Sequence, residues 1–79
     1  MKGFGSRLSE ARNAKGLTQL QLSKIMRRKT QVTISRWEND ITEPTLSEVV
    51  FLCFVLDVSA DWLLGLSDDP KNNQPKIAN

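Results

Sequence analysis

The sequence contains no histidine and a single cysteine, Cys53. Without histidine, neither histidine acid–base catalysis nor a histidine metal site is possible. One cysteine excludes a disulfide framework within the chain and a zinc site built from several cysteines. No pair of carboxylates is expected to share one face of the fold. We therefore predict that the protein is not an enzyme and that it needs no cofactor and no metal.

Long apolar segments are also missing. No stretch approaches the ~18 apolar residues of a membrane-spanning helix, and no charged start followed by an apolar run resembles a signal peptide. The 79 residues, of which 39% are hydrophobic and 25% charged, match one small soluble domain with little room for a substrate cavity. We expect a cytoplasmic binding module that contacts neither a membrane nor a small-molecule substrate.

The net charge of +2 conceals an uneven distribution along the chain. Residues 1–40 carry nine basic and three acidic side chains, whereas residues 41–79 carry two basic and six acidic side chains. A domain with one basic part can meet a polyanion on that side only. The alternative is a solvated surface that keeps the protein soluble, and charge alone does not decide between the two.

Apolar spacing and capping residues predict short helices and no strand. In the first helix Phe4 and Leu8 share the inner face; we expect this helix to begin at Gly5 or Ser6 and to end before Gly16. Capping boxes, in which a Thr hydroxyl and a Gln or Glu three residues later satisfy free amides, begin two further helices. Hydroxyl caps begin two more. The predicted caps are Thr18, Thr30, Thr45 and Ser59, and the helices after them cover about 19–26, 31–39, 46–56 and 60–64.

Four stretches carry a resemblance to a known family and occur in its order: 7–19, 33–39 (Thr-Ile-Ser-Arg-Trp-Glu-Asn), 43–46 (Glu-Pro-Thr-Leu) and 58–65 (Val-Ser-Ala-Asp-Trp-Leu-Leu-Gly). Over about residues 4–66 the chain resembles the helix-turn-helix family of phage repressors, Cro and the xenobiotic-response-element regulators. This resemblance implies a compact, all-α, five-helix fold like that of lambda repressor. Its second and third helices form the DNA-reading unit, and it binds double-stranded DNA, usually as a dimer.

The domain boundaries follow from the resemblance and from composition. The helix-turn-helix domain is expected over 1–66, with the helix-turn-helix itself at about 18–40. Residues 67–79 are polar and contain two prolines, so we predict a disordered tail there.

The helix at 31–39 is the predicted reading helix. A recognition helix in the major groove contacts bases mainly with its N-terminal residues. Here these are Gln31, Val32 and Thr33, with Arg36 one turn later. A Gln can pair with adenine, a Val can contact a thymine methyl group, and an Arg can bind guanine with two hydrogen bonds or bind a phosphate.

A second group of polar residues is expected at the DNA backbone. An amide side chain at the start of a helix can hold a phosphate, and the resemblance implies that Gln19 also braces Gln31. Three consecutive cations follow the second helix, in a turn that is one residue longer than the usual family form and lacks its glycine. They can clamp phosphates or complement the helix dipole. The predicted backbone contacts are Gln19, Arg27, Arg28, Lys29, Ser35 and Asn39, although a plain solvated surface explains Ser35 equally well.

Two further features are assigned to the structure of the domain. The resemblance implies an ion pair between Arg12 and Glu38 that joins the first and third helices, so we expect Arg12 to be structural and not to touch DNA. The apolar neighbours of Trp37 and Trp62 favour core packing over stacking on nucleotides.

The acidic loop at 40–43 is expected to add little to phosphate binding.

Apolar residues also occur where the family usually has polar ones. Residues 49–56 are eight consecutive apolar residues, although a helix needs only one buried stripe. Phe51 and Phe54, with Leu20 and Ile25 on the second helix, are therefore predicted to meet a protein partner, either a second copy or a different regulator. The alternative is that the tail around Ile77 folds over Phe51 and Phe54.

Two functions are consistent with these observations. The first is a sequence-specific DNA-binding transcriptional regulator, a phage or bacterial repressor or a Cro-like protein, that acts as a homodimer. The alternative is a modulator with the same fold that binds another repressor, as a heterodimer, through the exposed apolar surface and has little DNA binding of its own. The sequence does not separate repressor, activator, antitoxin and restriction-controller roles.

Overall fold

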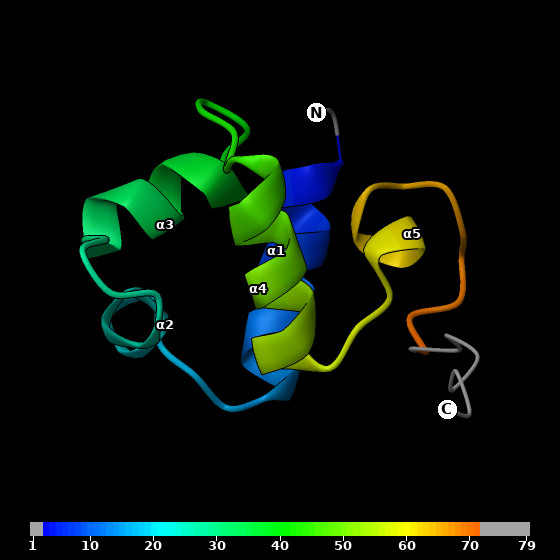
Figure 1. The fold of residues 1–79 in the computed structure, drawn as a ribbon, viewed down its shortest axis with the longest axis horizontal. Coiled ribbons are helices and arrows are strands. Elements are labelled where there is room, and N and C mark those ends of the chain that lie inside the picture. Colours follow the sequence, from blue (N-terminus) through cyan, green and yellow to red (C-terminus); the bar gives the residue numbers. More distant parts are fainter. Residues whose placement is uncertain (1–2, 72–79) are drawn as a thin grey trace.

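The computed structural model describes residues 3–71 and contains five α-helices, with no strand in that range (Figure 1). The helices are α1 (Phe4–Ala14), α2 (Gln19–Ile25), α3 (Gln31–Glu38), α4 (Leu46–Leu56) and α5 (Ala60–Leu63). The predicted all-α, five-helix architecture is confirmed. Within the described range, no helix is both long enough and apolar enough to cross a membrane.

The predicted caps begin four of these helices. Capping boxes are present at Thr18, with Gln21, and at Thr45, with Glu48. Single hydroxyl caps begin α3 and α5, because the side chains of Thr30 and Ser59 accept hydrogen bonds from backbone amides three residues later. Each cap needs only residues of its own first turn, so sequence spacing located these helix starts.

The predicted start of α1 is wrong. This helix begins at Phe4, ahead of Gly5 and Ser6, after Gly3 with φ of 88°. The Gly5 amide donates a hydrogen bond to Asp40 Oδ1 at 2.9 Å, so an acid beyond the end of α3 caps α1. A Cβ atom on Gly5 would overlap the backbone carbonyl of Glu38, which means that only glycine permits this close approach of α1 and α3.

The core takes one stripe from each helix. Figure 1 shows α2 and α3 on one side of α1 and α4, with α5 on the other side. Both tryptophans are buried in this core, as predicted. The core side chains are Phe4, Leu8, Ala11, Leu22, Met26, Ile34, Trp37, Val49, Leu52, Leu56, Val58, Trp62 and Leu63.

The chain stays attached to the helices after α5. The Arg7 guanidinium donates hydrogen bonds to the carbonyl oxygens of Trp62 (2.5 Å) and Ser67 (2.7 Å) and lies 5.1 Å from the centre of the Trp62 ring. The Ser59 amide donates to the Pro70 carbonyl at 3.0 Å. Contacts of the domain thus extend past residue 66 to residue 70. The rest of the predicted tail, 72–79, lies outside the described residues, and so does the proposed cover by Ile77.

Candidate nucleic-acid interface

A hollow of about 380 Å³ lies between the start of α2 and the outer side of α3. Its lining residues are Gln19, Gln31, Val32, Ser35 and Arg36. All five belong to the DNA contacts predicted from the sequence, three for bases and two for the backbone. The fold therefore brings these predicted contacts together on one open surface.

The position of this surface follows from the core side of α3. Ile34 and Trp37 point into the core and are almost completely buried. Because each helical residue rotates about 100° from the last, Gln31, Val32 and Arg36 then lie on the opposite side and are exposed. Val32 is an apolar side chain that is 56% exposed. An apolar contact such as a thymine methyl group would cover it.

The fourth predicted base contact lies apart from the others. Thr33 is half-buried and does not line the hollow. Its amide donates to Thr30 Oγ1 at 3.3 Å, and the two hydroxyl oxygens lie 3.4 Å apart. Thr33 therefore belongs to the N-terminal cap of α3 in this structure. Thr33 follows Val32 in the sequence, but the rotation of about 100° per helical residue turns its side chain away from the hollow.

Glu38 connects α1, α2 and α3 through its carboxylate. Its Oε2 lies 2.6 Å from Arg12 Nε, and its Oε1 accepts hydrogen bonds from Arg12 Nη2 (3.1 Å) and from Gln19 Nε2 (3.0 Å). Arg12 also donates to the Leu17 carbonyl at 2.7 Å. Both charged side chains are largely buried, and the hydrogen bond to Glu38 raises the pKa of Arg12 above its usual value. Arg12 is thus held inside the domain.

The amide of Gln19 has a different partner from the one that the resemblance implied. It donates to Glu38 Oε1, at the C-terminal end of α3, and not to Gln31 at the start of α3. The link fixes the position of Gln19 relative to the reading helix. Gln31 itself remains exposed at the edge of the hollow.

The turn between α2 and α3 contains two arginines in a left-handed conformation. Arg27 has φ of 51° and Arg28 has φ of 49°. This backbone costs a residue other than glycine roughly 1–2 kcal/mol, and it is how the chain closes a turn that lacks the usual glycine. Both side chains are exposed near the start of α3, where they can reach phosphates.

Lys29, the third cation of this turn, points toward α4. Its Nζ lies 2.5 Å from Glu48 Oε2 and 6.0 Å from the centre of the Trp37 ring. Partial burial raises the pKa of the Glu48 carboxyl, but hydrogen bonds from Lys29 and from the Thr45 amide outweigh it, so that the pKa is lowered. The ion pair joins the turn to α4 and engages a cation for which the sequence predicts a contact with the DNA backbone.

Ser35 and Asn39 lie one turn apart on α3 and its end. Asn39 Nδ2 donates to the Ser35 carbonyl at 2.8 Å, so this side chain caps the end of the helix. Ser35 lines the hollow, whereas Asn39 does not. Asn39 is exposed and Ser35 is half-buried, so neither side chain is prevented from contacting a DNA backbone. Ser35 lies closer to the expected base contacts.

Several charges of the basic part have structural partners, and of these only the Arg12–Glu38 pair was expected from the family resemblance. Arg7 binds α5 and the segment after it, Arg12 binds Glu38, and Lys29 binds Glu48. Asp40, which we had placed in an acidic loop, caps α1. The exposed cations next to the reading helix are therefore fewer than the sequence suggested. Arg27, Arg28 and Arg36 are the exposed ones in and around α3.

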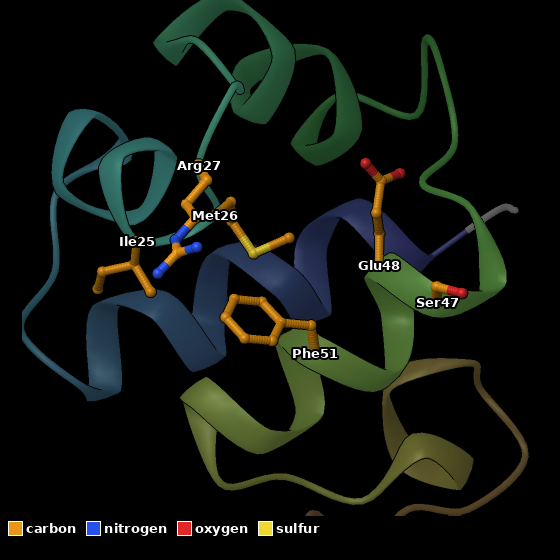
Figure 2. Close-up of a pocket in the computed structure, with 6 residues that line it drawn as sticks. All are labelled: Ile25, Met26, Arg27, Ser47, Glu48 and Phe51. Atoms are coloured by element: carbon orange, nitrogen blue, oxygen red, sulfur yellow. The ribbon is translucent and has the colours of Figure 1, made fainter.

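The predicted protein-contact residues are all exposed. They have exposed fractions of 46% for Leu20, 39% for Ile25, 42% for Phe51 and 83% for Phe54. A groove of about 440 Å³ lies between the end of α2 and α4. Figure 2 shows the Phe51 ring facing Ile25 and Met26 across this groove.

The chain belongs to the helix-turn-helix family. The model of the family described as Helix-turn-helix matches residues 8–63, which include all the side chains of the hollow. The match and the five-helix fold together define a helix-turn-helix protein of the Cro and repressor type, as the sequence predicted.

A curated relative is similar over most of this chain. It is the "Uncharacterized HTH-type transcriptional regulator YobD" of Bacillus subtilis (strain 168), 39% identical over 75 residues. The match covers 94% of this chain but 62% of that protein, so the chain spans less than two thirds of the relative's length. No solved structure gives a significant match.

Proposed function

We propose that this protein is a sequence-specific DNA-binding transcriptional regulator that reads the major groove with α3. The observation that carries the proposal is the hollow lined by Gln19, Gln31, Val32, Ser35 and Arg36. These side chains can in principle pair with bases or hold phosphates, and they share one open side of a helix-turn-helix domain. The family membership and the relative's name, a transcriptional regulator, support the same function.

Each side chain of the surface has a proposed role. Gln31 pairs with adenine, Val32 contacts a thymine methyl group, and Arg36 binds guanine or a phosphate. Thr33 contributes less to base reading, because the cap of α3 engages it. The backbone is held by Gln19, Arg27, Arg28, Ser35 and Asn39, with a smaller contribution from Lys29.

A dimer on a two-fold operator fits this mode of reading. Two copies would then address half-sites about one helical turn apart, roughly 34 Å. We propose such a phage or bacterial repressor or Cro-like protein as the form in which the domain acts.

A second candidate function is supported by the apolar surface. A modulator of the same fold would use Phe51 and Phe54 to bind another regulator and would bind little DNA by itself. The exposure of Phe54 favours this candidate, whereas the polar hollow on α3 favours direct reading of DNA.

Selection of duplexes from a randomised library tests the proposed function. The purified chain is expected to enrich one sequence, and its affinity for that duplex should fall steeply as salt rises, because phosphate contacts release counterions. A modulator would enrich no sequence. If the chain shows no salt-sensitive binding to any duplex, the proposed function is wrong.

A further inference from the structure

The groove between the end of α2 and α4 combines apolar side chains with one guanidinium. Its lining residues are Ile25, Met26, Arg27, Ser47, Glu48 and Phe51. Figure 2 shows the Arg27 side chain directed back toward Ile25 and the Phe51 ring. The volume of about 440 Å³ lies within the range of ~300–1,000 Å³ that is usual for small-molecule sites.

The charge of Arg27 is not balanced inside the fold. Among residues 3–71, no acid forms an ion pair with this guanidinium. The acid of the groove, Glu48, has both carboxylate oxygens engaged: Oε2 lies 2.5 Å from Lys29 Nζ, and Oε1 accepts a hydrogen bond from the Thr45 amide at 2.7 Å. The groove therefore offers an unpaired cation beside an apolar lining.

These two properties specify the chemistry of a ligand. A guanidinium binds a carboxylate with two parallel hydrogen bonds. Ile25 and Phe51 are 39% and 42% exposed, and an apolar body laid against them would remove that surface from water. A hydrophilic anion would leave both side chains in water, whereas an uncharged apolar molecule would leave Arg27 unpaired.

The charge of the ligand follows from the opposite wall. Arg27 supplies one positive charge, and the Lys29–Glu48 pair adds no net charge to the groove. A ligand with one negative charge is balanced by this arrangement. A dianion would keep an uncompensated charge close to the Glu48 carboxylate, which is unfavourable.

We propose that this groove binds a small monocarboxylic acid with an apolar body, of the size of a medium-chain fatty acid. The carboxylate binds the Arg27 guanidinium, and the body lies against Ile25, Met26 and Phe51. The binding itself requires no DNA.

The position of Arg27 links this ligand to DNA reading. Arg27 lies in the turn between α2 and α3 and is one of the side chains that we propose for the DNA backbone. A guanidinium held by a carboxylate is not available to a phosphate, so the ligand weakens DNA binding. This regulatory step rests on the proposed function.

A titration of the whole chain with sodium octanoate, followed by ¹H–¹⁵N NMR, tests the site. The amides of Ile25 and Phe51 should shift and saturate, with a dissociation constant of about 0.1–1 mM. Octanamide, which has the same body without the charge, should bind at least about tenfold more weakly. This comparison uses the unchanged chain, so it does not depend on how a variant folds.

Two neighbouring arginines provide a matched pair of variants. Arg27→Ala should raise the dissociation constant for octanoate by about tenfold. Arg28→Ala is the control, because Arg28 is exposed and has the same left-handed backbone but does not line the groove. It should leave the constant unchanged. Circular dichroism establishes that both variants are folded.

Three results would overturn the site. One is the lack of a saturable shift up to about 10 mM octanoate. The second is equal binding of octanoate and octanamide, which would indicate an apolar side chain of a partner protein as the occupant. The third is a shift of the same amides when the protein alone is diluted, which would assign the groove to a second copy.

Fluorescence anisotropy with the selected duplex tests the regulatory step. Saturating octanoate should raise the dissociation constant for the duplex by about three- to tenfold, as expected for the loss of one phosphate contact, and should have no such effect on Arg27→Ala. An unchanged constant in the wild-type chain would overturn the regulation and leave the site. A chain that binds octanoate but no duplex would remove the proposed function and keep the site.

Discussion

The outer sides of α3 and α4 are both left uncovered by the fold, yet they differ in chemistry. α3 presents an amide, a hydroxyl, Arg36 and one apolar side chain, Val32, whereas α4 presents Leu46, Val50 and two phenylalanines. Each helix needs only one stripe for the core, so neither outer side is required for folding. Polar donors and a cation match bases and phosphates, while an apolar side matches another protein surface.

The two sides also differ in how they are attached. The end of α3 is held through Glu38 to α1 and α2 by charged hydrogen bonds, whereas α4 is held mainly by Val49, Leu52 and Leu56 in the core. The position of the proposed reading surface therefore depends on one largely buried carboxylate. The apolar surface depends on ordinary packing.

The largest effect should come from breaking that attachment of α3. Glu38→Ala leaves the Arg12 guanidinium largely buried without its partner and removes the acceptor for Gln19. Loss of one member of a buried pair costs about 3–5 kcal/mol, so much of the stability of a small domain should disappear. Urea denaturation measures it. Glu10→Ala, at an exposed position, should change the free energy of unfolding by less than about 0.5 kcal/mol, and an equally small loss for Glu38→Ala would contradict the attachment.

A smaller effect is expected on the reading surface itself. Arg36→Ala and Gln31→Ala should each weaken binding to the selected duplex by about 1–3 kcal/mol, with little loss for unrelated duplexes. Fluorescence anisotropy with both duplexes measures the difference. Thr33→Ala is the comparison within the same helix. It should lose less base discrimination, because Thr33 takes part in the N-terminal cap of α3 with Thr30. Equal losses for all three would show that the hollow does not define the reading surface.

The ion pair between Lys29, in the turn between α2 and α3, and Glu48 of α4 predicts how stability depends on pH. Since the folded pKa of Glu48 lies below its ordinary value, its ion pair with Lys29 stabilises the fold above the unfolded-state pKa. That stability is lost as pH falls through the folded pKa. Glu48→Gln, which can keep the capping box, should lower stability at neutral pH by about 0.5–1 kcal/mol. Thermal unfolding should show the difference vanish in acid, and a difference that persists there would contradict the assignment.

The smallest effect is expected on the apolar side. Phe54→Gln should change the free energy of unfolding of the monomer by no more than about 0.5 kcal/mol, because the ring is not part of the core. Leu52→Ala, two residues earlier and fully buried, should cost about 2–5 kcal/mol. Tryptophan fluorescence during unfolding, at concentrations where the chain is monomeric, compares the two. A large loss for Phe54→Gln would mean that this side of α4 contributes to the fold.

Local signals predicted most of the helices and which side of α3 faces away from the core. The starts of α2, α3, α4 and α5 each depend on a cap within one turn, so spacing was sufficient. The buried positions of Ile34 and Trp37 then determine which residues of α3 face outward. Four of these outward-facing residues line the hollow. The family resemblance supplied the order of the helices.

Only the tertiary structure decided how the charges are used. Asp40 caps α1 across 35 residues, and Arg7 binds carbonyl groups 55 and 60 residues away. Apart from Arg12, which the resemblance pairs with Glu38, the sequence does not separate the cations that are available to DNA from those that are not. Availability depends on which acids and carbonyls the fold brings within hydrogen-bond distance. Lys29 is the clearest example, because its position in the chain adjoins the reading helix while its ammonium group lies against Glu48. Composition is fixed by the chain, whereas the partner of a charge is fixed by packing.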